Sequence, residues 1–292
     1  MIKYNLLAEE FEANRPHLQA VAYRMLGSLS DADDAVQESW FRFSRSDMSG
    51  IENIRGWLTT VVSRVCLDML RSRKARREES MENYVTEKAI NRKAGGDPVN
   101  ETLLADSVGL ALLVVLDTLK PAERIAFVLH DIFGVPFVEI APIVGRSETS
   151  ARQLASRARR RVQGAEAPPG GDLSVQRTLV DSFLAAARNG NFDELLTVLD
   201  PDVVLWDDRS EASGSTSNEV RGAPAVAKEL MKGRAKAARP VLVNGAVGIV
   251  VAPRGRLLLV LVPAFAHGKI VGIDVVTDPA RVQQLNLAVL NV

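Results

Sequence analysis

The sequence lacks the features that would tie it to a membrane, an oxidising compartment or a metal. Its 292 residues include one cysteine, Cys66, which excludes an internal disulfide and a zinc site built from several cysteines. The longest apolar runs, Leu110–Leu116 and Leu257–Ala266, are shorter than the roughly 18 residues that a membrane span needs. The first residues, MIKYNLLAEEF, lack the basic-then-apolar order of a signal peptide. We therefore expect a cytoplasmic protein with no cofactor, no metal and no membrane partner.

The chain also lacks a net charge, because 36 basic residues balance 36 acidic ones. These charges are nevertheless segregated. Residues 71–77 and 152–161 each hold five basic residues and no acid, whereas residues 31–38 are acidic. This pattern indicates a polyanion bound at two places and a protein partner bound at a third. For either basic block alone, the alternative is a solvated helix end whose arginines suit the helix dipole.

Turn-forming residues and changes of periodicity divide the chain into three domains. Two stretches, one containing GGDPVNE and one containing EAPPGGD, break the helical pattern and are predicted linkers. The last part begins with helices and continues with hairpin-linked strands, which predicts an α+β fold with a curved antiparallel sheet. We expect a helical domain at 1–79, a linker at 80–102, a second helical domain at 103–163, a linker at 164–172 and the α+β domain at 173–292.

The end of the second helical domain has the pattern of a helix-turn-helix. A short helix closed by Gly145 precedes a helix for which Ser147 is the expected N-cap. Small residues such as Ala151 and Ala155 form the inner stripe of the second helix. Its outer face carries donors for base edges and phosphates: Thr149, Arg152, Gln153, Ser156, Arg157 and Arg160. The alternative is a surface helix that packs on its neighbour and binds nothing.

The first domain offers a second basic helix. The sequence WLTTVVSRVCLDMLRSRKARR, which opens at Trp57, pairs an apolar face with a basic tail and follows a polar loop. Such a helix can hold backbone phosphates while an unstacked base is captured beside it. Reading duplex with one module and opened strand with another is what a promoter-melting factor requires. An acidic helix, with its N-cap expected near Asp31, precedes this region.

Three motifs in this order resemble a known family. DADDAVQESWFRF, IENIRGWLTTVVSRVCLDMLRSRKARR and LKPAERIAFVLHDIFGVPFVEIAPIVGRSETSARQLASRARRRV look like the two conserved domains of an extracytoplasmic-function (ECF) sigma factor of bacterial RNA polymerase. The resemblance covers roughly residues 6–77 and 104–163. Residues 173–290 look like a SnoaL-like domain of the nuclear-transport-factor-2 (NTF2) fold. The fusion resembles the sigma-J type of ECF factors.

The resemblance implies a promoter-specificity subunit, with a role for each matching position. Polymerase binding, at the clamp of the β′ subunit, would fall to Asp33, Asp34, Gln37, Glu38 and Phe41. The minus-ten element would fall to the loop around Ser49–Arg55 and to Asn53, Arg55, Arg64, Asp68, Arg71, Arg73 and Lys74. The minus-thirty-five element would fall to the outer face of the second helix of the helix-turn-helix. The charges of Asp33 and Asp34 would also stabilise the N-terminus of their helix, and this role is compatible with polymerase binding.

The chain departs from the sigma-J pattern at three places. GGDPVNE replaces a Trp-Leu-Pro-Glu-Pro stretch, DDRSEASGSTSNEVRG replaces a compact Asp-Gly-Gly-Gly motif, and TDPARV replaces Asn-Pro-Asp-Lys-Leu. Those elements are thought to link the third domain to the sigma domains, so regulation is expected to differ in detail.

The third domain is expected to regulate the sigma domains and not to catalyse a reaction. Candidate pocket residues are Trp206, Phe265, His267 and Asp274, with Asp207 and Asp208 beside them. His267 reads as a hairpin-turn residue, and strand alternation would point Asp274 inward, where it would need a partner. Two other classes stay open: an NTF2-like isomerase or cyclase with DNA-localising helices, and a ligand-sensing helix-turn-helix repressor.

Overall fold

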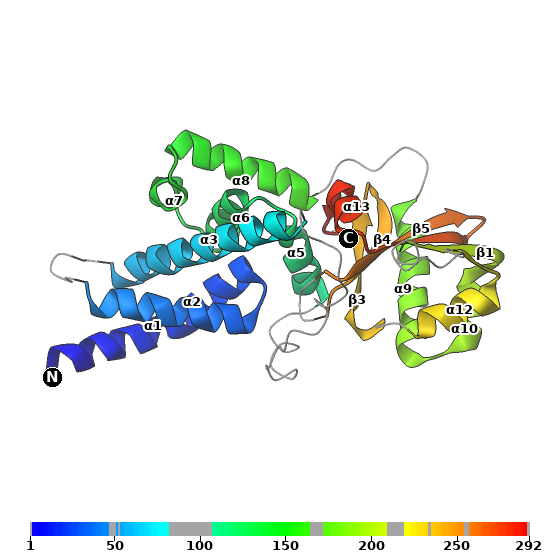
Figure 1. Ribbon diagram of the computed structural model, residues 1–292, viewed down its shortest axis with the longest axis horizontal. Helices are drawn as coiled ribbons and strands as arrows, with labels where there is room; N and C mark the ends of the chain where they lie inside the picture. The colour runs from blue at the N-terminus through cyan, green and yellow to red at the C-terminus, as the bar shows by residue number, and fades with distance from the viewer. Residues whose placement is uncertain are drawn as a thin grey trace. The chain divides into compact units, whose positions relative to one another are not determined.

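The computed structural model describes residues 2–46, 51, 53–81, 107–163, 172–208, 219–232, 235–253 and 257–290. They group into two compact units, whose elements are labelled in Figure 1. The helical unit comprises Met1–Leu104 and Leu119–Arg159, and the sheet unit comprises Ala105–Thr118 and Arg160–Val292. The contacts therefore group 105–118 with the sheet, although the motif order assigns this stretch to the second helical domain. The proposed linkers lie mostly outside the described residues.

The first half of the helical unit is a bundle of α1 (Ile2–Leu26), α2 (Leu29–Ser44) and α3 (Ile54–Met81), coloured blue to cyan in Figure 1. Each helix contacts the other two. Aromatic rings fill the core: the centroid of Phe11 lies 5.1 Å from that of Trp40, and the centroid of Phe43 lies 5.7 Å from that of Trp57. The helical prediction for this part is confirmed.

The N-cap predicted for α2 is wrong by one turn. The helix begins at Leu29, and its cap is Ser28, whose hydroxyl accepts a hydrogen bond from the backbone N–H of Asp31 at 3.4 Å. Both residue types are good N-caps. Ser28 holds the position because Gly27, at φ 74°, turns the chain immediately before it.

The second half of the unit contains α6 (Pro121–Phe127), a π-helical turn (Val128–Ile132), α7 (Phe137–Val144) and α8 (Glu148–Gln163). Both α6 and α7 contact α3. The buried arc of α3 contains Leu58, Val62 and Val65, which recur at helical spacing. It also includes Cys66, Leu67 and Leu70, whereas Val61 and Met69 are half-buried.

Cys66 lies in this interior, and burial raises the pKa of its thiol to about 12, although Arg124 and Arg73 act in the opposite direction. Because the thiolate is the reactive form, we expect alkylation of the native chain at pH 8 to be on the order of 10³-fold slower than that of a free cysteine. Timed alkylation read by mass spectrometry measures the rate. The urea-unfolded chain should react at the ordinary rate, and equally fast reaction of the native chain would contradict a buried Cys66.

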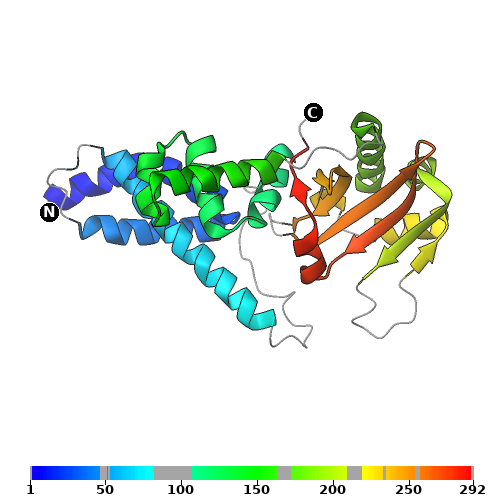
Figure 2. The same ribbon diagram turned by 90° about the horizontal axis from the view of Figure 1, so that it is seen from above.

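The sheet unit combines helices with a mixed sheet. Its elements after α5 (Ser107–Asp117) are α9 (Leu173–Asn189), α10 (Phe192–Val198), β1 (Leu199–Asp207), β2 (Glu219–Arg221), α12 (Ala223–Met231), a 3-10 turn (Ala235–Ala237), β3 (Ala238–Val243), β4 (Ala246–Val251), β5 (Leu259–Ala266), β6 (Lys269–Val276), α13 (Pro279–Gln284) and β7 (Leu287–Ala288). The described strands follow the order β2-β1-β6-β5-β4-β3-β7 and lie side by side in Figure 2.

The predicted α+β fold is confirmed, but the expectation of a wholly antiparallel sheet is wrong at one place. Strand β1 pairs with β6 in parallel, with Leu205 opposite Ile273. Helix α12 and the strands β2, β3, β4 and β5 lie between β1 and β6 in the chain, so no local pattern signals this pairing. Val180, Phe183 and Leu184 of α9 pack in one core with residues of β1 and β6.

Helix α5 contacts β3 and β7. Its Leu113 and Leu116 are fully buried, as expected for the apolar run that contains them. The sheet unit also includes the end of α8, because the N–H of Val289 donates to the carbonyl oxygen of Val162 at 2.8 Å.

Candidate nucleic-acid interface

A tight turn between α7 and α8 builds the predicted helix-turn-helix. Gly145 ends α7 in the left-handed conformation, at φ 69° and ψ 42°, which glycine adopts without strain. The hydroxyl of Ser147 then accepts a hydrogen bond from the N–H of Ser150 at 3.3 Å, which confirms the predicted cap. Ile140 and Val144 of α7 are buried.

The two faces of α8 are as sharply divided as its sequence predicts. Ala151, Ala155 and Ala158 are fully buried, and their small side chains let the helix lie close to its support. All the side chains predicted to contact the minus-thirty-five element are exposed: Thr149, Arg152, Gln153, Ser156, Arg157 and Arg160. The helix therefore presents one polar, cationic face to solvent.

Neighbouring groups orient the arginines of α8. Arg152 pairs with Glu148 one turn earlier at 2.5 Å, and its guanidinium lies 5.2 Å from the centroid of the Phe137 ring. Arg157 lies 4.0 Å from Glu123, a buried carboxylate of α6. The Arg152–Glu148 pair is exposed and contributes about 0–1 kcal/mol, so a phosphate or base contact can replace it at small cost.

On α3, the predicted minus-ten residues fall into two groups. Arg64, Asp68, Arg71 and Lys74 are exposed at helical spacing, and Arg71 lies 4.0 Å from Asp68. Arg73 instead turns toward the bundle. Its Nη2 lies 2.5 Å from the Asp31 carboxylate, and its Nη1 donates to the carbonyl oxygen of Leu26 at 3.3 Å.

The start of α3 is held by local bonds. The Asn53 side chain accepts a hydrogen bond from the N–H of Gly56 at 2.9 Å, and Arg55 donates to Nδ1 of His17 at 3.0 Å. Burial and the charge of Arg55 lower the pKa of His17, which favours the neutral ring that can accept this bond. Of the predicted loop around Ser49–Arg55, Ile51 and 53–55 are among the described residues.

The acidic helix α2 also has two distinct faces. Ala35, Val36 and Phe43 are buried in the bundle. The predicted polymerase contacts share the outer face and are all exposed: Asp33, Asp34, Gln37, Glu38 and Phe41. Phe41 is the exception to the polar character of this face, with 45% of its surface exposed. Exposed aromatic rings are enriched at protein-binding surfaces, so Phe41 makes this face a candidate for one.

Comparisons with known proteins agree with this geometry. Residues 11–76 match the family model for Sigma-70 region 2, and residues 109–162 match that for Sigma-70, region 4. The chain is 40% identical over 247 residues to the ECF RNA polymerase sigma factor SigJ of Mycobacterium tuberculosis, covering 82% of this chain and 79% of SigJ. It is 34% identical over 288 residues to the probable ECF RNA polymerase sigma factor SigI of the same species, covering 98% of each chain. The chain belongs to the ECF RNA polymerase sigma factors.

A crystal structure of the M. tuberculosis sigma factor SigJ is 34% identical to this sigma factor, with a TM-score of 0.46, covering 94% of this chain and 97% of that one. Sigma factors are initiation factors that bind core RNA polymerase and promoter DNA. The matches to Sigma-70 regions 2 and 4 and to the SigJ and SigI sequences confirm the resemblance to the ECF family, and the enzyme and repressor alternatives are not favoured.

Two of the candidate pocket residues of this sigma factor, Asp274 and Trp206, are neighbours, but they lie on the exposed face of the sheet. Asp274 is 38% exposed and lies on the face opposite the core side chains of Ile273 and Val275, so the prediction that it points inward is wrong. Trp206 is its strand partner in β1 and is also exposed. Phe265 packs on the core, and His267 occupies the β5–β6 turn at φ 51°, as expected.

Asp274 does have a charged partner, as expected. The sequence did not show that this partner, Arg281, also binds Asp208. Arg281 of α13 binds Asp274 at 2.8 Å and Asp208 at 3.2 Å. The carboxylate of Asp208, 4% exposed, also accepts hydrogen bonds from the backbone N–H groups of Thr277 and Asp278. Asp208 thereby joins the end of β1 to TDPARV, one of the stretches where the chain departs from the sigma-J pattern.

We expect the ionised carboxylate of Asp208 to stabilise the folded sheet unit. Burial raises the pKa of its carboxyl, but the bonds from Thr277 and Asp278 and the charge of Arg281 outweigh burial, and the net pKa is lowered. Because the pKa of the folded state lies below that of the unfolded state, the stabilisation is complete above about pH 4 and is lost as the pH falls through the folded pKa. We expect Asp208→Asn to lower the free energy of unfolding by about 2 kcal/mol at pH 7, measured in urea.

Asp202→Asn, which changes an exposed carboxylate of β1, is the control and should be neutral. The difference between wild type and Asp208→Asn should shrink at pH 3. An equal effect at both pH values would contradict the role of the charged carboxylate.

Among the described residues, no group of three or more His, Cys, Asp or Glu side chains is arranged to hold a metal ion. None of the described helices is long and apolar enough to cross a membrane.

Proposed function

We propose that this sigma factor reads the minus-thirty-five element of its promoters with the outer face of α8. The observation that supports this proposal is the exposure of Arg152, Gln153 and Arg157 on a helix whose opposite face consists of small, buried residues. Arginine and glutamine side chains can form paired hydrogen bonds with base edges in the major groove. Arg160, further along the exposed face, suits the phosphate backbone.

The minus-ten element is assigned to the exposed face of α3 and to the polar residues at its start. Arg64, Arg71 and Lys74 would bind strand phosphates, and Asp68 would accept from a base. Asn53 and Arg55 lie next to the loop proposed to hold an unstacked base. Arg73 is given a structural role in place of the predicted DNA contact, because Asp31 and Leu26 occupy its guanidinium.

The outer face of α2 is assigned to the clamp region of the β′ subunit of RNA polymerase. Its carboxylates would speed association with a basic surface, and Phe41 would contribute most of the affinity by being buried. Because it would act with RNA polymerase, we expect this sigma factor to lie in the cytoplasm.

The sheet unit is assigned a regulatory role and no catalysis. Asp274, the best candidate for an acid or base, is committed to an ion pair with Arg281. Helix α5 lies where the match to region 4 begins, and it packs against β3 and β7. By holding α5, residues 173–292 would influence the domain at 103–163 and its use of promoter DNA, while 1–79 acts on the minus-ten element.

Two experiments test this proposal. Core polymerase with the full chain should yield run-off transcripts from the promoters of its regulon, and core polymerase alone should not. Deleting residues 165–292 should change the amount or the promoter selection of these transcripts, since α5 loses β3 and β7. Absence of transcripts from every template would contradict the sigma function, and unchanged output after deletion would contradict the regulatory role.

A further inference from the structure

Two arginines of the sheet unit, Arg188 and Arg239, meet at one carbonyl oxygen, and we call them the arginine pair. Nη2 of Arg188, near the end of α9, donates a hydrogen bond to the carbonyl oxygen of Ala238 at 2.7 Å. Nη1 of Arg239, in β3, donates to the same oxygen at 2.7 Å. The two nitrogens can lie no further apart than twice this distance, so two positive charges are held together at the beginning of β3.

The other bonds of the arginine pair also go to neutral acceptors. Nε of Arg188 donates to the carbonyl oxygen of Ala235 at 3.5 Å, and Nη1 of Arg239 donates to that of Lys236 at 2.8 Å. Nε of Arg239 is buried and has no hydrogen-bond partner. Because buried donors are usually satisfied, this unmatched donor is one indication of a missing acceptor.

No acid compensates the arginine pair within the described part of the chain. Helices α5 and α9 and strands β4 and β7 pack on β3, and together they carry two acids. Asp181 of α9 pairs with Arg177 at 3.2 Å. Asp117 of α5 forms an ion pair with neither member of the arginine pair. Burial lowers the pKa of Arg239, and the charge of Arg188 lowers it further, so the two cations repel each other. A bound anion would replace this repulsion with attraction.

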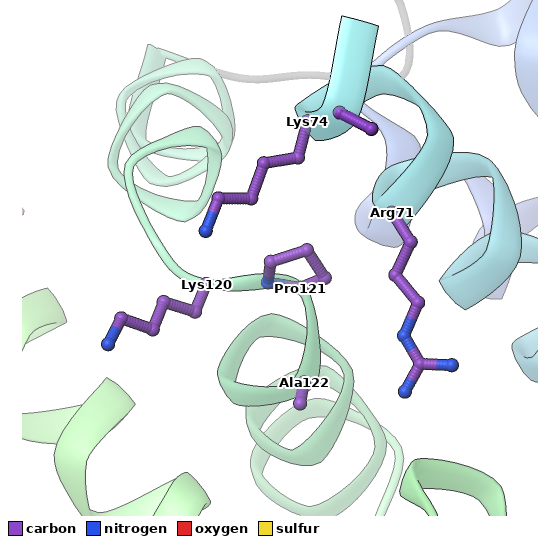
Figure 3. A pocket seen from close by; sticks show the side chains of 6 residues that line it. Arg71, Lys74, Lys120, Pro121 and Ala122 are labelled. Atoms are coloured by element: carbon purple, nitrogen blue, oxygen red, sulfur yellow. The ribbon is translucent and has the colours of Figure 1, made fainter. Parts of the chain in front are cut away.

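This convergence distinguishes the arginine pair from a second cationic region, the hollow between α3 and the start of α6. In Figure 3, the charged end of Arg71 points away from those of Lys74 and Lys120. The Glu123 carboxylate also lies beside Lys120, whose backbone N–H donates to it at 3.4 Å. The hollow therefore does not direct its cations at one ligand, whereas the arginine pair does.

The charge and the shape of the arginine pair favour a phosphate group. A planar guanidinium can bind two oxygens of one phosphate or carboxylate. A phosphate monoester carries a charge of about −1.5 to −2 at pH 7 and three acceptor oxygens, so it matches two uncompensated cations better than a singly charged carboxylate does. Exposed Lys236 adds a third positive charge to the same stretch of chain. We propose that the arginine pair binds the phosphate group of a small molecule.

The site would connect a ligand with the regulatory role of the sheet unit. Arg239 belongs to β3, the strand that α5 contacts, and α5 lies where the match to region 4 begins. A phosphate that stabilises the beginning of β3 would favour the arrangement in which β3 holds α5. This consequence rests on the proposed function, but binding of phosphate by the arginine pair does not.

The test measures the affinity of the full chain for inorganic phosphate by isothermal titration calorimetry, with wild type and Arg188→Ala. Arg188 is exposed, and the carbonyl oxygen of Ala238 keeps its bond from Arg239 in the variant, so we expect the fold to be retained. The Kd should rise about tenfold or more, as for loss of one charge-assisted contact. Arg177→Ala is the matched control, because Arg177 lies on the same helix and already pairs with Asp181, and it should leave the Kd unchanged.

Two further measurements locate the site and define its ligand class. Phosphate should slow amide hydrogen exchange in β3 of wild type and not of Arg188→Ala, a local effect that phosphate bound to other basic surfaces would not produce. Acetate should bind about tenfold or more weakly than phosphate, because it brings less charge to the two cations.

Equal Kd values for wild type, Arg188→Ala and Arg177→Ala, or exchange in β3 that phosphate does not change, would overturn the site. Acetate that binds as tightly as phosphate would overturn the assignment of the ligand class. The binding measurements need neither polymerase nor promoter, and run-off transcription with the wild-type chain tests the sigma function separately. Failure of this site and failure of the proposed function are therefore distinguishable.

Discussion

Replacing both Arg152 and Arg157 by alanine should abolish promoter-directed transcription while leaving the protein folded. Both side chains are exposed on α8, and neither contributes to the buried stripe. Each well-formed contact between a side chain and a base contributes about 1–3 kcal/mol, so the pair is worth about 2–6 kcal/mol, or a factor of about 30 to more than 10⁴ in promoter affinity. Run-off transcription with reconstituted holoenzyme measures this loss.

Arg177→Ala is the matched control, because Arg177 also lies on a helix and pairs with a carboxylate one turn away, Asp181, at 3.2 Å. It should leave transcription unchanged. The double variant should still bind core polymerase, which shows that the defect lies in DNA recognition. If the double variant initiates as well as wild type, α8 is not the reading helix.

The second large effect is expected at Phe41, with Phe41→Ala weakening the complex with core polymerase by about 30-fold. The ring is 45% exposed in a face of carboxylates, and a buried aromatic anchor commonly contributes 2 kcal/mol or more to an interface, which is about 30-fold in Kd. Fluorescence or surface-plasmon titration of core polymerase measures the Kd. The loss should appear mainly as faster dissociation.

Val175→Ala removes an apolar side chain that is similarly exposed, in α9, and should leave the affinity unchanged. Asp33→Asn with Asp34→Asn should instead slow association, and this effect should fade at high salt. Equal affinity of Phe41→Ala and wild type would remove α2 from the polymerase interface.

Features that depend only on the residues of a single helix could be predicted from the sequence. The faces of α8, its cap at Ser147 and the turn at Gly145 follow from periodicity and from the preferences of single residues. The outer face of α2 follows in the same way. The N-cap of α2 could not be predicted in this way. Ser28 and Asp31 are both good N-caps, and the preceding turn at Gly27 decides between them.

The remaining features depend on contacts between distant segments. The parallel pairing of β1 and β6 brings together residues about 70 positions apart, as Leu205 and Ile273 illustrate. The sequence alone predicts that Arg73 contacts DNA. It does not show that the distant residues Asp31 and Leu26 bind the guanidinium group of Arg73. Similarly, no local pattern says that α5 packs on β3 and β7.

The central claim is that α8 and α3 contact two separate elements of one promoter within the polymerase complex. DNA cleavage by iron chelates attached at Ser156→Cys or Asp68→Cys tests it directly, since both positions are exposed and the native Cys66 is buried. We expect Ser156→Cys to cleave at the minus-thirty-five element and Asp68→Cys at the minus-ten element, and both to require core polymerase. Cleavage by both at the same place, or at neither element in a complex that initiates transcription, would contradict the account.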